Sequence, residues 1–232
     1  MCRETSLMGL VAPSLLAADF ARLAEALEII KAAGASLVHV DIMDGHFTPD
    51  ITVGQPVIAS LRKATDLVLD AHLLIERPER YAAQFADLGA DRIAVHVEAT
   101  PHLHRVLEAI RARGAKAGAA LNPGTPISAV TEVLGEIDFL TILTTDPGIE
   151  EQAFIPRSVG KVRAAAQARA EGRRDFALQV EGGVSFDNLE ELVRAGADIL
   201  VAGSAIFDNE DPKARLGEMI RLAAEVRQTA KV

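Results

Sequence analysis

Short apolar runs alternate with longer amphipathic stretches eight times along this chain of 232 residues. The apolar runs, which we expect to form strands, lie at residues 10–14, 37–41, 67–72, 92–96, 117–121, 139–143, 176–180 and 199–202. The helix-like stretches lie at residues 20–33, 56–63, 80–88, 102–113, 127–134, 157–171, 187–195 and 213–227. Buried parallel strands read as continuous apolar runs, and helices usually join them. The alternation therefore predicts an α/β protein, a (β/α)8 TIM barrel, with a doubly wound open sheet as the alternative.

Four of the helix-like stretches end with the same signal, a glycine followed by alanine, at Gly34, Gly89, Gly114 and Gly196. Glycine accepts the left-handed conformation that ends many helices, so we interpret these positions as helix stops without chemistry. No change of composition and no Pro- or Ser-rich linker divides the sequence. We therefore expect one domain, residues 1–232, whose length is normal for a barrel of this class.

Composition argues against several classes of function. The formal net charge is -9, so nucleic acids and anionic membranes, which attract Lys and Arg, are not expected partners. No apolar run reaches the roughly 18 residues of a membrane span. The single cysteine, Cys2, cannot form an internal disulfide, and the N-terminal sequence lacks the apolar run of a signal peptide. These features predict a cytoplasmic protein.

Polar side chains gather where the predicted strands end, which is the active-site end of a barrel. His39 and Asp41 are two residues apart on the second strand, so both point to the same side. His72 ends the third strand, and Glu181 follows the seventh. Two imidazoles and two carboxylates suit one divalent ion such as Zn²⁺, Mn²⁺, Fe²⁺ or Co²⁺. We predict that these four residues hold a metal ion.

Other polar residues near the strand ends are assigned lesser roles. Asp70 and His96 also lie toward the ends of strands, and we interpret them as residues that support the ligands or stay in the polar core. His102 and His104 fall on a helix and are expected to face solvent.

Glycine-rich turns after the last two strands favour an anionic substrate. Gly182 and Gly183 follow the seventh strand, and Gly203 and Ser204 follow the eighth, just before a short helix-like segment. Phosphate sites of barrels often lie in these two loops, and the amides at a helix N-terminus attract anions. These turns predict a phosphate group on the ligand.

Several motifs resemble the ribulose-phosphate 3-epimerase family. In chain order they are APSLLAADF at 12–20, HVDIMDGHF at 39–47, DAHL at 70–73, HVEA at 96–99, LNP at 121–123 and VAGSAIF at 201–207. The match extends over residues 10–208 and implies the same barrel fold. It also implies epimerisation at carbon 3 of a ketose phosphate, ribulose 5-phosphate to xylulose 5-phosphate, through an enediolate.

The resemblance assigns roles to named positions. It places one divalent metal ion on His39, Asp41, His72 and Glu181, and it makes Asp41 and Glu181 the acid and base. The residues that it implies for substrate binding are Ser14, Met43, His72, Gly148, Gly182, Gly183, Gly203 and Ser204. The implied partner is a small-molecule sugar phosphate, and a homo-oligomer is expected because the family is commonly oligomeric.

This sequence departs from the family pattern at three places. Glu181 stands where the family has aspartate, and Glu150 and Glu151 replace small residues in the loop after the sixth strand. Leu74 and either Ile142 or Leu143 stand near positions of the family's pocket methionines. The reaction type is therefore expected to hold more firmly than the substrate. A 3-epimerase of a different or non-phosphorylated ketose is the second hypothesis.

Two rival functions remain at this point. A barrel aldolase or decarboxylase would share the enediolate, but related enzymes place a Lys beside an Asp at the strand ends. No Lys ends a predicted strand here, and Lys116 opens the fifth at the opposite end. A catalytically inactive barrel that binds a metal or sugar phosphate is the non-enzyme alternative, and deuterium exchange at the substrate carbon would distinguish it.

Overall fold

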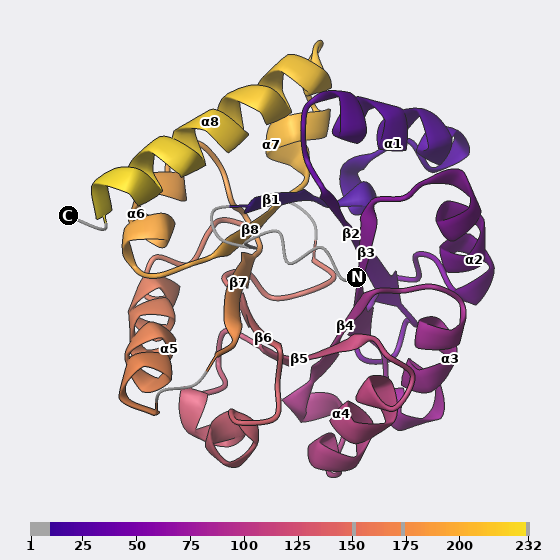
Figure 1. Cartoon of the computed structure of the whole chain (residues 1–232), viewed down its shortest axis with the longest axis vertical. Coiled ribbons are helices and arrows are strands. Elements are labelled where there is room, and N and C mark those ends of the chain that lie inside the picture. The colour runs from indigo at the N-terminus through magenta and orange to yellow at the C-terminus, as the bar shows by residue number, and fades with distance from the viewer. Residues whose placement is uncertain (1–9, 150–151, 173–174, 231–232) are drawn as a thin grey trace.

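The computed structural model describes residues 10–149, 152–172 and 175–230. In these residues eight parallel strands form one sheet in the order β1-β8-β7-β6-β5-β4-β3-β2. An isolated parallel bridge between Ser14 and His39 joins β1 to β2, the two ends of that order. The strands enclose a barrel that the helices surround, as Figure 1 shows. The predicted TIM barrel is confirmed.

The strands lie within a few residues of the predicted runs. They are β1 Leu10–Pro13, β2 Leu37–Met43, β3 Val68–Leu74, β4 Arg92–His96, β5 Lys116–Leu121, β6 Phe139–Leu143, β7 Ala177–Glu181 and β8 Ile199–Ala202. The α-helices are α1 Leu23–Ala32, α2 Gln55–Ala64, α3 Ala82–Asp87, α4 Leu103–Arg111, α5 Ser158–Gly172, α6 Leu189–Arg194, α7 Ser204–Phe207 and α8 Pro212–Ala230. Short 3-10 helices are η1 Leu15–Ala17, η2 Phe20–Arg22, η3 Pro78–Arg80, η4 Val97–Ala99 and η5 Ile127–Val133.

The predicted helix-like stretch at 127–134 forms only the 3-10 helix η5, not an α-helix. Ile127, Val130 and Val133 are β-branched, and Ser128 competes for backbone hydrogen bonds. Such residues have low α-helix propensity because their side chains lose freedom or offer the backbone other partners. The connection between β5 and β6 therefore keeps its place in the barrel but has a tighter helical form.

The four glycine helix stops behave as predicted. Gly34, Gly89, Gly114 and Gly196 all have positive φ angles, between 82° and 109°. At Gly89 and Gly196 an added Cβ would also press on a neighbouring side chain, of Arg62 and Ala166 respectively. Each glycine turns the chain from a helix into the next strand.

Side chains alternate between two cores along each strand, because successive residues of a strand point to opposite sides. On β2, Val38 and Val40 join the large outer core between sheet and helices. Leu37 points the other way and packs with Ala12, Ile199 and Val201 inside the barrel. His39 and Asp41 share the inward side with Leu37, so the polar cluster stands on an apolar floor.

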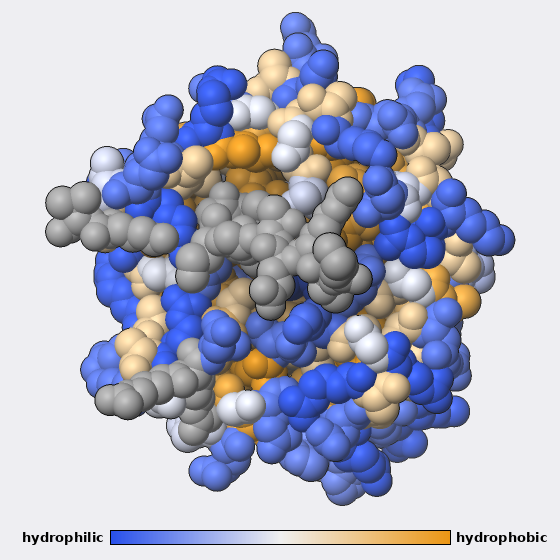
Figure 2. Space-filling model, viewed as in Figure 1, coloured by the Kyte–Doolittle hydropathy of each residue, from blue (hydrophilic) through white to orange (hydrophobic). Residues whose placement is uncertain are grey.

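The periphery of one face of the molecule is mostly polar (Figure 2). On the face shown in Figure 2, hydrophilic residues cover the rim and hydrophobic ones lie nearer the centre. Among the described residues, no helix combines the length and apolar character needed to cross a membrane.

Candidate active site

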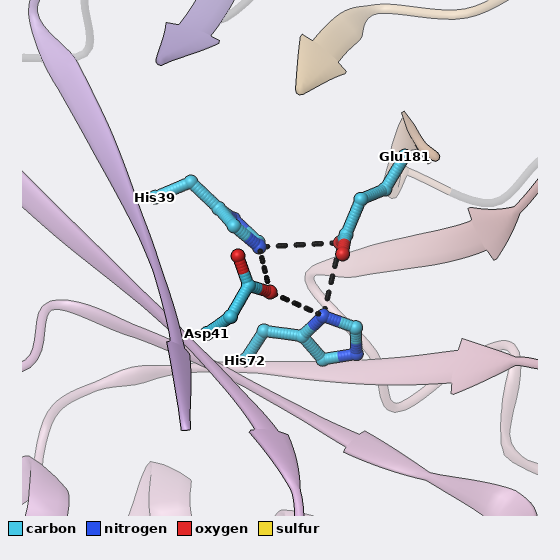
Figure 3. Close-up of side chains that lie close together, drawn as sticks. All are labelled: His39, Asp41, His72 and Glu181. Atoms are coloured by element: carbon cyan, nitrogen blue, oxygen red, sulfur yellow. Dashed lines mark hydrogen bonds and ion pairs between the residues drawn. The ribbon is translucent and has the colours of Figure 1, made fainter. Parts of the chain in front are cut away.

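Three strands bring the four predicted metal ligands together inside the barrel. His39 and Asp41 come from β2, His72 from β3 and Glu181 from β7, and Figure 3 shows all four side chains converging. In the parallel register Asp41 lies beside His72, one level above the pair His39 and Asp70. The imidazoles are fully buried, and the side chain of Glu181 is 13% exposed.

The donor atoms of these side chains lie close to one another. His39 Nε2 is 3.1 Å from Asp41 Oδ1 and 3.2 Å from Glu181 Oε2. His72 Nδ1 is 3.4 Å from Asp41 Oδ1 and 2.9 Å from Glu181 Oε2. All four atoms lie within 4.8 Å of one another. Two ligand atoms that are each bound at about 2.1 Å to one ion stand about 3.0–3.4 Å apart, so these separations fit a shared cation.

Unsatisfied atoms support the same interpretation. His72 Nδ1 and Glu181 Oε2 are buried without a hydrogen-bond partner, although they lie only 2.9 Å apart. Buried polar atoms normally find a partner, because leaving one unpaired costs about 1–3 kcal/mol. A metal ion would satisfy both atoms, and nitrogen and carboxylate ligands suit a transition metal such as zinc or manganese. The residues present therefore fit the metal ion that the family resemblance implies.

His39 is held by a buried polar network below the cluster. Its Nδ1 lies 2.8 Å from Asp70 Oδ2. Asp70 also accepts hydrogen bonds from Arg92 Nε at 3.0 Å and Gln179 Nε2 at 3.0 Å, and Arg92 Nη2 donates to Gln179 Oε1 at 2.8 Å. A carboxylate behind a ligating imidazole fixes the tautomer and orientation of the ring. Asp70 thus has the supporting position expected of it.

Sequence analysis assigned no role to Arg92 or Gln179. Both are buried polar residues: Arg92 is the first residue of β4, and Gln179 lies in the middle of β7. A polar residue in a largely apolar strand was the available signal, because a buried polar group or charge requires a partner. The partner of both residues, Asp70, can be identified only from the closed barrel, which brings the three side chains together.

Asp41 is fixed on both sides of its carboxylate. Oδ1 faces the two imidazoles, and Oδ2 accepts a hydrogen bond from Ser14 Oγ at 2.7 Å. The carbonyl oxygen of Asp41 accepts from Thr52 Oγ1 at 2.6 Å. Ser14, expected at the substrate, thus orients Asp41 in this structure and lies next to the cluster.

Charges within the cluster control its protonation. Burial by itself lowers the pKa of an imidazole, but nearby Glu181 and Asp41 raise the pKa of His72 to about 9. Burial also lowers the pKa of His39, but Asp41 and Glu181 outweigh this effect and raise that pKa well above its usual value. Although burial opposes it, the imidazoles hold the pKa of Asp41 well below its ordinary range and lower that of Glu181. The cluster therefore requires positive charge, from protons or from a cation.

An apolar wall lies beside the cluster. Met43, Leu74 and Leu143 pack as one buried group, with Phe47 against them. Leu143 occupies this wall, whereas Ile142 belongs to the outer core, which decides between the two residues that the sequence left open. The wall gives Met43 a position close to the two ligands of β2.

The glycines expected around a phosphate lie in loops beyond β6, β7 and β8. Gly148, Gly182 and Gly183 all have positive φ, and Gly203 and Ser204 lie at the start of α7. A Cβ at Gly148 would lie 2.6 Å from Thr48 Cβ, so the loops after β2 and β6 touch. Glu150 and Glu151, like Cys2, lie outside the described residues.

Two further histidines are separate from the cluster. His102 and His104 are exposed, as predicted, and His104 Nε2 lies 3.0 Å from Glu136 Oε2 at the surface. His96, by contrast, is fully buried and contacts His72 directly, with 2.9 Å between their Nε2 atoms.

Comparison with known proteins decides the family. The model of the ribulose-phosphate 3 epimerase family matches residues 10–207. The chain belongs to the ribulose-phosphate 3-epimerase family. The family predicted from the sequence motifs is thereby confirmed.

Relatives that carry the family's name agree with that assignment, and a solved structure outside the family shares the fold. The ribulose-phosphate 3-epimerase of Bacillus subtilis is 42% identical over 210 residues, which cover 90% of this chain and 97% of the relative. The enzyme of that name from Synechocystis is 46% identical over 200 residues, covering 85% and 87%. The crystal structure of KGPDC from Streptococcus mutans matches with a TM-score of 0.68 over 94% of this chain and 99% of that chain. Its sequence identity of 17% supports the shared fold alone.

Proposed function

We propose that this member of the ribulose-phosphate 3-epimerase family interconverts ribulose 5-phosphate and xylulose 5-phosphate by inverting carbon 3. The observation that carries the proposal is the convergence of Asp41 and Glu181, from β2 and β7, on two buried imidazoles. Epimerisation needs one group to remove a proton and a second to return one on the opposite face. Two carboxylates from separate strands could meet that need.

Asp41 is held in the deprotonated form that a base requires. Its pKa lies well below the ordinary range, despite burial, because the two imidazoles stabilise the anion. Ser14 holds its second oxygen, so the carboxylate keeps one orientation. Asp41 would remove the carbon 3 proton of one epimer, and Glu181 would protonate the other face. The roles would be exchanged in the reverse direction.

His39, Asp41, His72 and Glu181 would hold one divalent ion. When bound, such an ion supplies positive charge that makes a proton beside a ketone more acidic. Met43, Leu74 and Leu143 would exclude water from the reacting carbon, because their apolar wall lies beside the cluster. We further propose that the substrate phosphate binds amides of the loops that contain Gly148, Gly182, Gly183, Gly203 and Ser204.

Turnover in heavy water tests the proposal directly. Purified protein is incubated with ribulose 5-phosphate, and both xylulose 5-phosphate and deuterium at carbon 3 are measured. The two-base reaction predicts both products, whereas an inactive binding barrel would leave carbon 3 unlabelled. A parallel incubation with a chelator should stop the exchange, and added Zn²⁺ or Mn²⁺ should restore it.

Free ribulose and other ketose phosphates form the second arm of the same assay. The acidic residues in the loop after β6 are the reason for this arm, because negative charges near a phosphate repel the phosphate unless they face solvent. Faster exchange with one of these compounds than with ribulose 5-phosphate would reassign the substrate and keep the reaction type.

A further inference from the structure

A line of polar groups leads away from the metal cluster through His72, His96 and Glu98. The Nε2 atoms of the two histidines lie 2.9 Å apart, and His96 Nδ1 lies 3.1 Å from Glu98 Oε2. Glu98 Oε1 accepts a hydrogen bond of 2.8 Å from the backbone N–H of Asn122. The proton transfers proposed above use neither His96 nor Glu98.

The hydrogen positions along this line follow from its outer end. The Glu98 carboxylate can only accept hydrogen bonds, so His96 Nδ1 must carry a hydrogen and donate it. A neutral His96 then presents a lone pair on Nε2, and His72 Nε2 must carry the hydrogen between the rings. In the neutral form of His72 that binds a metal ion, the remaining nitrogen, Nδ1, is therefore free of hydrogen and faces Asp41 and Glu181.

Packing keeps the two rings in the required orientation. The planes of His72 and His96 differ by only 17°, which lets the N–H of one ring point toward the in-plane lone pair of the other. Phe47 covers His96, with 4.7 Å between the ring centroids. Both imidazoles are fully buried, so no bulk water can take the place of either ring as the hydrogen-bond partner of the other.

We propose that Glu98 is a positioning residue that acts through His96 to hold His72 in the tautomer able to bind the metal ion. The inference rests on the metal site of the proposed function. It gives the two histidine ligands different supports: Asp70 contacts His39 directly, whereas Glu98 reaches His72 through a second imidazole. Loss of such a support typically weakens metal affinity about 10–100-fold.

The variant Glu98→Gln separates this role from simple packing. Gln has the same shape, and its oxygen must stay with the Asn122 N–H, so its NH2 group faces His96 Nδ1. His96 must then accept there and donate from Nε2, which forces the hydrogen of His72 onto Nδ1. Glu98→Ala removes the carboxylate without imposing the wrong tautomer. A purely structural role predicts that Ala is worse than Gln, whereas the relay predicts the reverse order.

Zinc affinity of the full chain is the first measurement, by competition with a chromophoric chelator. We expect Glu98→Gln to bind zinc about 10–100-fold more weakly than the wild type and more weakly than Glu98→Ala. The exposed Glu132→Gln, which removes one surface carboxylate, is the charge control and should bind like the wild type. Wild-type affinity in Glu98→Gln, or greater loss in Glu98→Ala, would overturn the proposal.

Nitrogen-15 spectra of the histidine rings are the second measurement and do not depend on the variants folding. The wild type without metal should carry hydrogen on Nδ1 of His96 and none on its Nε2. Hydrogen on Nε2 of His96 refutes the relay. If the wild type fails to bind zinc, the proposed metal site is wrong, and these spectra still decide the relay independently.

Discussion

Shortening Glu181 to aspartate tests the geometry of the cluster most sharply, because the family pattern and this structure predict opposite results. The family pattern that the sequence resembles has aspartate at this position, so similarity alone predicts that Glu181→Asp is harmless. In the structure the longer side chain is what brings Oε2 to 2.9 Å from His72 Nδ1 and 3.2 Å from His39 Nε2. Removing one methylene withdraws the carboxylate by about 1.5 Å.

The backbone of β7 offers little room to compensate. The carbonyl oxygen of Glu181 accepts hydrogen bonds from Thr144 N at 2.7 Å and from Thr144 Oγ1 at 2.9 Å, and the residue pairs with Leu143 and Val201. A withdrawn carboxylate would stand more than about 4 Å from His72, beyond the separation of ligands on one ion. Misplacement of a catalytic group by about 1 Å can cost about 100-fold in rate. We therefore expect Glu181→Asp to lose about 100-fold in kcat/KM, equivalent to about 2.7 kcal/mol.

The assay compares kcat/KM for ribulose 5-phosphate and zinc affinity in the wild type, Glu181→Asp and Glu181→Gln. Gln keeps the reach of the side chain and loses only the negative charge, so it separates position from charge. Glu181→Asp should weaken zinc binding as well as turnover, while circular dichroism shows that the metal-free protein stays folded. A variant that turns over at the wild-type rate would refute the geometric reasoning, because the reach of Glu181 would then be irrelevant.

Three other predictions concern residues inside the barrel. Asp41→Asn should reduce turnover about 10²–10⁴-fold while circular dichroism shows a folded protein, and normal turnover would remove Asp41 from the mechanism. The folded pKa of His72 is about 9 against an ordinary 6.5, so its stabilisation is complete below pH 6.5 and is lost as the pH rises through 9. The Tm of the chelator-treated protein should therefore fall over that range, and a flat or rising Tm contradicts this. Gly118→Ala places a Cβ on the fully buried Phe139 ring and should cost about 1–3 kcal/mol in urea unfolding, whereas Gly135→Ala has open space and should be nearly neutral.

Much of the fold could be predicted because local patterns were consistent along the chain. The apolar run of β2 and the helix stop at Gly34 each identify a boundary without knowledge of distant residues. Strand alternation also predicted that His39 and Asp41 share a side, and the structure places them so. Their roles as metal ligands stay predictions, as do the single domain and the homo-oligomer.

Asp70 was expected in a supporting position, but the groups that hold it, Arg92 and Gln179, could not be predicted, because these contacts depend on strand register and barrel closure. Asp70 and His72 form an inward pair on β3 just as His39 and Asp41 do on β2, and sequence spacing alone does not say which member reaches the centre. The register aligns Asp70 with His39 and Asp41 with His72, so His72 lies at the level of the cluster and Asp70 lies one level below it. Gln179 reaches Asp70 from 109 positions away in the chain, a distance over which local patterns carry no information.

The charges inside the barrel explain why these four ligands suit a divalent ion. Arg92 balances Asp70, with Nε 3.0 Å from the carboxylate, so two buried negative charges remain on Asp41 and Glu181. Neutral imidazoles, the form that binds a metal, cannot cancel them, whereas one divalent cation can. Without the ion, protonation of His39 and His72 balances the same two charges, which is why the pKa values of both rise. A bound divalent ion and protonated histidines thus neutralise the same two carboxylates in different states of the protein. The loss of stability between pH 6.5 and 9 should therefore disappear once zinc is bound.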